Sequence, residues 1–132
     1  MASNSFVMGF DFGTKKIGVA IGQAITGTAT PLAILKARDG IPNWQQVERI
    51  IKEWQPALLV VGLPLNMDGT PSEMSRLSEK FARKLHGRYN IPSKTVDERL
   101  SSFEAALMTD QEGPIDSIAA QLILETYFRE TK

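Results

Sequence analysis

Asp11 is the residue of this chain whose surroundings point most clearly to chemistry. It lies inside an apolar run, Phe6 to Phe12, which is followed by a glycine turn and by a second apolar run from Ile17 to Ile21. Burying a carboxylate among such residues costs several kcal/mol unless a cation or hydrogen-bond donors compensate. The pattern therefore predicts a strand-turn-strand hairpin that presents one acid to a metal ion or to a phosphate.

Two further acids are expected to converge on Asp11. Glu98, beside Asp97, lies at the expected exit of a strand, and Asp116 opens the last expected helix. Carboxylates held close together cannot all ionise without a cation. Magnesium prefers oxygen ligands, and a pair of divalent ions about 3.5–4 Å apart stabilises both oxygens of a phosphodiester cleavage. We therefore expect Asp11, Glu98 and Asp116 to be catalytic ligands of Mg²⁺ or Mn²⁺.

Each of these acids also has a purely structural interpretation. Asp11 could cap the turn that follows it by accepting backbone hydrogen bonds. Glu98 could pair with Arg99 or Lys94 at the end of a strand. Asp116 could be an ordinary residue of a helix start. The metal-site hypothesis depends on the three acids together and not on any one of them.

Composition narrows the classes of function. The chain has 132 residues, enough for one domain with its own core. It carries 15 acidic and 15 basic residues, so a polyanion must be recognised by local segregation of charge. Cysteine is absent and histidine occurs once, which excludes disulfides, thiolate metal sites and histidine pairs. With no signal-like or membrane-spanning stretch, we expect a cytoplasmic protein that does not contact membranes.

The hydrophobic pattern predicts a mixed α/β fold. Three antiparallel strands followed by alternating helices and strands give a five-stranded mixed sheet with helices on both faces, the ribonuclease-H-like architecture. The first strand is expected at the centre of the sheet, and the fifth strand beside that centre. The expected strands are 5–12, 16–22, 30–36, 57–62 and 93–97, and the expected helices are 43–55, 71–86, 101–108 and 115–129. Within the last helix, the core candidates are Ile118, Leu122, Tyr127 and Phe128.

Basic residues in two regions are candidates for binding nucleic acid. The lysines of the first turn could contact a phosphate near Asp11, or could be ordinary turn residues. The helix after Pro71 carries a basic stripe opposite its apolar face, which can follow a phosphate backbone or can simply be solvated. Asn66, with Thr70, lies in a loop after a buried strand, at the edge where open sheets bind ligands. The expected nucleic-acid-binding residues are Lys15, Lys16, Asn66, Arg76, Lys80, Arg83, Lys84 and Arg99.

Four motifs occur in one order along the chain. They are Asp11-Phe-Gly-Thr-Lys-Lys-Ile-Gly-Val-Ala20, Gly62-Leu-Pro-Leu-Asn-Met-Asp-Gly-Thr70, Asp97-Glu-Arg-Leu-Ser101 and Asp116-Ser-Ile-Ala-Ala120. From about Phe6 to Phe128 the chain resembles the YqgF family, described both as pre-16S rRNA nucleases and as Holliday-junction-resolvase-like proteins. One segment differs from the family pattern, because 109–114 is short and acidic where members usually carry a longer loop with glycine and lysine.

The resemblance implies a function as well as a fold. It implies metal-dependent nuclease activity in the cytoplasm, processing the 5′ end of pre-16S rRNA. It also implies the same acids, Asp11, Glu98 (with Asp97) and Asp116. Nothing in the sequence distinguishes RNA from DNA as the substrate.

The sequence is therefore compatible with three functions. The first is an endonuclease that cleaves structured nucleic acid, with pre-16S rRNA and ribosomal precursor particles as partners, or with branched DNA as in a Holliday junction resolvase. The second is a non-catalytic rRNA-binding assembly factor. The third is an ATP-binding protein, because the first motif also resembles the phosphate loop of actin-like and Hsp70-like ATPases. We expect a monomer or a weak dimer, since no segment announces a two-fold interface.

Overall fold

The computed structural model describes residues 6–66, 68–97 and 115–131. Within these ranges six strands form one mixed sheet in the order β4-β3-β2-β1-β5-β6. The central strand, β1, pairs antiparallel with β2 and parallel with β5, as its position in the sequence predicts. The strands are β1 (Phe6–Asp11), β2 (Lys16–Gln23), β3 (Thr28–Arg38), β4 (Ile41–Pro42), β5 (Leu58–Leu63) and β6 (Ser93–Asp97).

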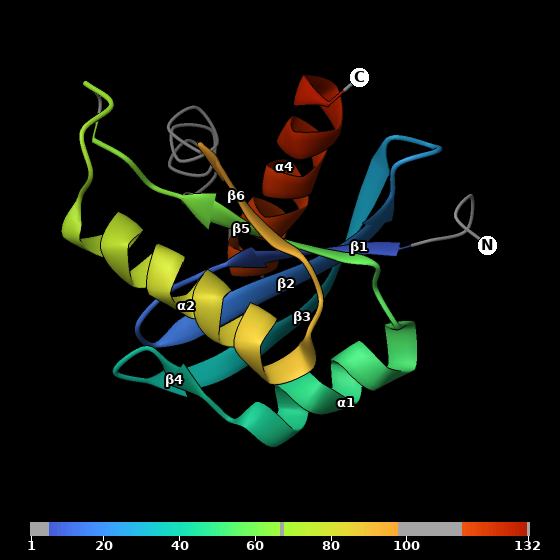
Figure 1. The fold of residues 1–132 in the computed structure, drawn as a ribbon, viewed down its shortest axis with the longest axis horizontal. Coiled ribbons are helices and arrows are strands. Elements are labelled where there is room, and N and C mark those ends of the chain that lie inside the picture. Colours follow the sequence, from blue (N-terminus) through green and yellow to red (C-terminus); the bar gives the residue numbers. More distant parts are fainter. Residues whose placement is uncertain (1–5, 67, 98–114, 132) are drawn as a thin grey trace.

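Helices cover both faces of this sheet, which confirms the expected layers. Helices α1 (Trp44–Trp54) and α2 (Glu73–Tyr89) lie together on one face, and α4 (Ile115–Glu130) lies on the other (Figure 1). The helix expected at 101–108 and the acidic segment 109–114 lie outside the described residues. No helix in the described ranges is long and apolar enough to cross a membrane.

The sixth strand corrects the expectation of five. The segment Asp39 to Pro42 was expected to be a turn only, but Ile41 and Pro42 pair with the end of β3. The turn itself consists of Asp39 and Gly40, which both have positive φ angles of 53° and 80°. Asp-Gly is the sequence that a two-residue hairpin of this handedness prefers. The sequence pattern does not predict this strand because it has only two residues before the next helix begins.

The helix ends follow local capping signals. The predicted N-cap of α1, Asn43, accepts a hydrogen bond from the Gln45 amide at 2.9 Å. Helix α2, however, begins after Ser72 and not at Pro71, because Ser72 and Ser75 form a reciprocal capping box. The same helix was expected to break at Gly87 but continues to Tyr89, where Asn90 caps it in the left-handed conformation.

Strand β3 carries a bulge near the outer edge of the sheet. Val19 of β2 lies opposite Ala33, but the next residue, Ala20, lies opposite Pro31. Leu32 is therefore the extra residue of the bulge. In the described residues β4 pairs only with the last two residues of β3, so the rest of this edge has no strand beside it. Pro31 thus occupies the edge position that its missing amide donor predicts.

Helix α4 packs very closely on the centre of the sheet. A Cβ atom added to Gly9 of β1 would lie 2.5 Å from Cγ of Leu124 and 3.2 Å from the carbonyl oxygen of Ala120. A Cβ added to Gly22 of β2 would lie 3.0 Å from the ring of Phe128. The small residues of β1 and β2 therefore let α4 approach within contact of their backbones.

The buried face of α4 differs partly from the expected one. Of the four core candidates, Phe128 is buried, whereas Ile118, Leu122 and Tyr127 are only half-buried. Polar and apolar residues are interspersed around the helix, so its pattern does not select one face. The residues of α4 buried in this core are Ala120, Ile123, Leu124 and Phe128.

The close approach at Gly9 predicts the effect of adding one methyl group there. Gly9→Ala places a carbon where Leu124 and Ala120 already lie, so we expect the free energy of unfolding to fall by about 1–3 kcal/mol. Urea denaturation followed by circular dichroism measures this change. The matched control is Gly87→Ala in α2, where an added Cβ meets no atom within 4 Å and where alanine should stabilise by about 0.5–1 kcal/mol. Equal effects of the two substitutions would contradict this account of the α4 contact.

Candidate active site

Asp11 ends the central strand at the carboxyl edge of the parallel part of the sheet. It is half-buried, and it lies opposite Gly18 of β2. On its other side, β1 pairs with β5 up to Phe10 and Val61, the residues just before Asp11 and Gly62. The carboxyl edge of such strands is where open α/β sheets bind ligands.

Strand alternation determines which face Asp11 occupies. Met8 and Phe10 belong to the core cluster that includes residues of α1 and α2, and Val7 belongs to the cluster that includes α4. Since successive residues of a strand point to opposite faces, Gly9 and Asp11 lie on the α4 side. The contact of Gly9 with Leu124 agrees with this assignment.

The course of α4 brings its first turn toward Asp11. Phe128, near the end of the helix, contacts Gly22 near the end of β2, and Leu124, one turn earlier, contacts Gly9. Earlier turns of α4 therefore lie over later residues of β1, and the helix runs antiparallel to that strand. The backbone of Asp116 lies in the first turn of α4, at the Asp11 end, whereas its side chain is outside the described part.

The strand that precedes Glu98 is not beside β1. Strand β6 is the outermost strand on this side, and β5 lies between it and β1, which corrects the expected neighbourhood. Val96 packs in the α4 cluster, so the next residue, Asp97, lies on the opposite face, the one covered by α2. Glu98 and Arg99 lie outside the described residues.

The described residues thus place one of the three expected acids with its side chain. In the described ranges no three histidine, aspartate or glutamate side chains are grouped so that they could hold a metal ion. The backbone does bring the Asp11 end of β1 and the start of α4 to the same end and face of the sheet. Carboxylate oxygens are the donors that Mg²⁺ and Mn²⁺ prefer, so the expected set fits such an ion in kind.

The loop after β5 is organised by its own side chains. The Asn66 side chain donates to Oγ1 of Thr70 at 3.0 Å and to the carbonyl of Pro71 at 3.4 Å. Thr70 in turn donates to the carboxylate of Asp68 from its amide, at 3.0 Å, and from its hydroxyl, at 2.6 Å. These bonds occupy both donors of the Asn66 amide group. These bonds support the interpretation of the loop as a tight connection. The carboxylate of Asp68, in the Asp-Gly turn sequence, holds Thr70 in place, and the sequence pattern did not predict this role.

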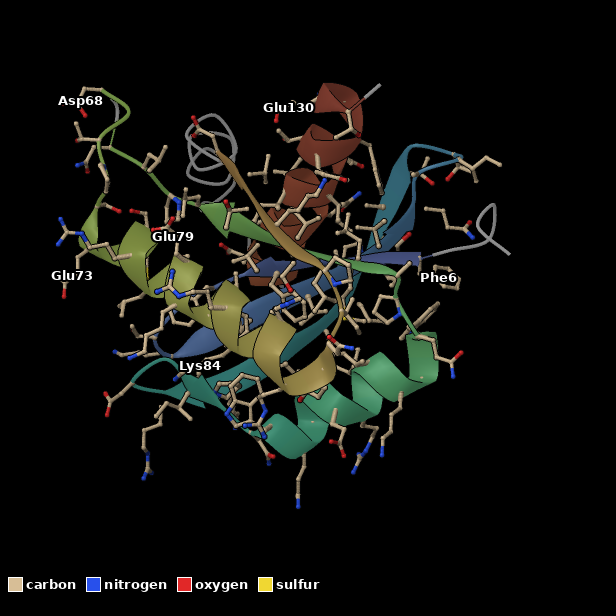
Figure 2. All side chains as sticks on the ribbon, in the orientation of Figure 1. Phe6, Asp68, Glu73, Glu79, Lys84 and Glu130 are labelled. Carbon is tan, nitrogen blue, oxygen red and sulfur yellow. The ribbon has the colours of Figure 1, made fainter. Side chains whose placement is uncertain are left out.

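The expected basic residues divide between two faces of the molecule. Lys15 and Lys16 are exposed at the turn that follows Asp11. The stripe on α2 is exposed as predicted, but α2 covers the sheet face opposite Asp11. Its acidic neighbours Glu73 and Glu79 are exposed too, and Figure 2 shows Glu73 projecting from the start of α2 away from the rest of the molecule. The residues of the stripe are Arg76, Lys80, Arg83 and Lys84.

Solved structures define the class of fold. RuvC of Thermus thermophilus, in complex with a Holliday junction substrate, matches with a TM-score of 0.56 and 14% identity over 96% of this chain and 95% of that one. The Holliday junction resolvase of fowlpox virus matches with a TM-score of 0.54 and 17% identity over 96% and 99% of the two chains. The chain therefore has the ribonuclease-H-like fold of the RuvC-type resolvases, as the sequence predicted.

Sequence comparison then identifies the family. The model of the RuvX family, described as Holliday junction resolvase, matches residues 5–130. A relative from Azotobacter vinelandii is 52% identical over 98% of this chain and 97% of its own length, and one from Proteus mirabilis is 56% identical over 96% of each; both are named candidate pre-16S rRNA nucleases. The chain belongs to the RuvX family, which confirms the resemblance to YqgF proteins and classes it as a nuclease, an enzyme that hydrolyses phosphodiester bonds.

Proposed function

We propose that the protein is a metal-dependent endonuclease that processes the 5′ end of pre-16S rRNA within ribosomal precursor particles in the cytoplasm. The observation that carries the proposal is the position of Asp11, a half-buried acid at the carboxyl edge of the central strand, on the face and at the end where α4 begins. The names of the relatives favour rRNA as the substrate, and the name of the family keeps Holliday junction DNA as the alternative.

Asp11, Glu98 and Asp116 would hold Mg²⁺ or Mn²⁺ in this proposal. The support is the donor set, which contains only oxygen ligands, and the position of Asp11 at the carboxyl edge of the parallel strands, where open α/β sheets bind ligands. Bound there, the metal would supply stabilisation of charge on the attacking and leaving oxygens of the phosphodiester. The protein itself contributes the packing of β1 against α4 at Gly9, which holds the backbones of Asp11 and Asp116 at the same end of the sheet.

Glu98, and not Asp97, is the partner that the strand geometry favours. Asp97 is in register with Leu63 of β5, and both lie on the α2 side of the sheet, away from Asp11. A residue that continued the alternation after Asp97 would return to the α4 side. The family motif contains both acids, and the face of the sheet on which each lies distinguishes them.

Lys15 and Lys16 would contact the phosphates next to the scissile bond. Both are exposed, and Lys16 is two residues along β2 from Gly18, the antiparallel partner of Asp11. A lysine side chain near Asp11 attracts the phosphate backbone and does not recognise the base sequence of the nucleic acid.

The first test replaces the central acid. Asp11→Asn should lower the cleavage rate at least about 100-fold, because a lost metal ligand removes several kcal/mol of charge stabilisation. The rate is measured with two labelled probes, an RNA that carries the 5′ end of 16S rRNA with its precursor extension and a four-way DNA junction. Asp39→Asn, at the exposed turn between β3 and β4, is the control and should cut normally. Undiminished cleavage by Asp11→Asn, with an unchanged circular dichroism spectrum, would refute its role.

The second test compares the neighbouring acids. We expect Glu98→Gln to lose at least about 100-fold in rate and Asp97→Asn to stay within about tenfold of the parent, because only the first would remove a metal ligand. Single-turnover cleavage of the same RNA probe provides the measurement. The reverse order of the two effects would contradict the assignment of Glu98 as the metal ligand.

The third test removes the metal. Chelation with EDTA should abolish cleavage, and added MgCl₂ or MnCl₂ should restore it, whereas CaCl₂ should restore binding better than the rate. The expectation follows from an acid set that cannot stabilise the transition state without a cation. Full activity after exhaustive chelation would exclude the proposed chemistry while leaving the fold assignment intact.

A further inference from the structure

We propose that Lys16, Lys36 and Arg38 form a phosphate-binding track, which lies beside Asp11 on the α4 side of the sheet and holds the backbone of a bound nucleic acid strand. The inference rests on the proposed function in one respect, namely that Asp11 marks the cleavage site. It adds a direction for the substrate, outward from β1 across β2 and β3, and it adds two residues, Lys36 and Arg38, that no motif includes.

Strand register places the three cations on one face. Ile17 of β2 lies opposite Leu35 of β3, and both are buried in the cluster on the α1 and α2 side. Lys16 lies opposite Lys36, and alternation therefore puts both on the α4 side. Arg38 is two residues beyond Lys36 on the same strand, and it shares that face.

The track begins close to Asp11. Asp11 lies opposite Gly18, and Gly18 lies opposite Ile34, so one row of the sheet joins the acid to β3. Lys16 and Lys36 form the next row on the same face. With strands ~4.8 Å apart and a rise of ~3.3 Å per residue, the Cα atoms of Lys16 and Lys36 lie about 8 Å and about 12 Å from that of Asp11. These separations suit a nucleic acid strand whose scissile phosphate is at Asp11.

The pair Lys16 and Lys36 is unfavourable for the isolated protein. Like charges directly opposite each other on antiparallel strands destabilise a sheet. Both lysines are exposed, and in the described residues neither takes part in an ion pair. A bound polyanion is the partner that would neutralise such a pair, because each phosphate brings one negative charge.

The surface between the cations and Asp11 is open in the described residues. Gly18 has no side chain there, and Ile34 is 39% exposed although it lies on a face that α4 covers elsewhere. Helix α4 turns away from this end of β3, since its last turns contact Gly22 and Ala29 at the other end of the strand pair. Among the described helices none covers this part of β2 and β3, so that a nucleic acid backbone can approach it without displacing any of them.

The basic stripe on α2 is the competing surface. It offers more cations, but α2 covers the opposite face of the sheet, and Glu79 is exposed among them. A strand bound along α2 would be separated from Asp11 by the thickness of the sheet. The track on β2 and β3 shares the face of the acid, and we therefore prefer it.

The double variant Lys36→Gln/Arg38→Gln tests the track. Fluorescence anisotropy with the labelled RNA and the labelled four-way DNA junction should show a loss of affinity of about 10-fold to 100-fold near 100 mM KCl. The slope of log K against log salt should become shallower by about 1.4 to 1.8, as expected for two lost phosphate contacts. A loss with one probe only would support the track and identify the nucleic acid that it holds.

The matched control is Arg49→Gln/Lys52→Gln on α1, which removes the same charge from exposed positions outside any proposed site. If the track variant lost no more affinity than this control with either probe, the proposal would be overturned. Folding is checked by the melting temperature, which should equal or exceed that of the parent because the facing lysines no longer repel. A clear fall in melting temperature with unchanged salt slope would indicate a structural role instead and would also overturn the proposal.

The design keeps this inference separate from the proposed function. Asp11→Asn should bind both probes as the parent does, whereas the track variant should keep its rate at saturating substrate and raise KM. An absence of cleavage in the parent would count against the nuclease proposal, and the binding and salt measurements would still decide the fate of the track.

Discussion

The contact between α4 and the centre of the sheet is the constraint on which the arrangement of the site depends. A strand with a side chain at position 9 could not lie against Leu124 and the Ala120 carbonyl at the observed separation. Because Gly9 is two residues before Asp11, the helix is fixed to the sheet immediately next to the acid. The position of the first turn of α4, with the backbone of Asp116, is therefore set by the close contact of the β1 backbone with Leu124 and the Ala120 carbonyl.

The two faces of the sheet differ in the side chains that they carry. The α1 and α2 side contains the larger aromatic core, in which Phe81 contacts Phe10, Phe12 and Trp44. The α4 side is lined by small residues near its centre and carries Asp11 at its edge. A face built from bulky rings suits stability, because large buried side chains contribute most to it. A face built from small residues lets backbone and ligand approach the acid, which is what a site for a bulky polymer requires.

The fold was largely predictable from the sequence because its signals are local. Continuous apolar runs marked β1 and β5, and Asn43 marked the start of α1. The features that the sequence did not predict depend on contacts between residues far apart in the chain. The mixture of polar and apolar residues around α4 does not reveal which side meets the sheet. Only the packing of Val96 and the register of β5 and β6 put Asp97 on the side away from Asp11. The alternating basic residues of β3 are visible in the sequence. Only the strand order shows that they lie on the same face of the sheet as Asp11.

The bulge at Pro31 has a consequence for behaviour in concentrated solution. An outer strand of eleven residues offers a row of unpaired amides and carbonyls, and such a row invites a second molecule to add a strand of its own. Proline removes one donor from that row, and the extra residue, Leu32, twists the strand so that a straight partner cannot follow it. The short β4 caps the far end. Together these features hinder the addition of a strand from a second copy at the β3 edge of the sheet.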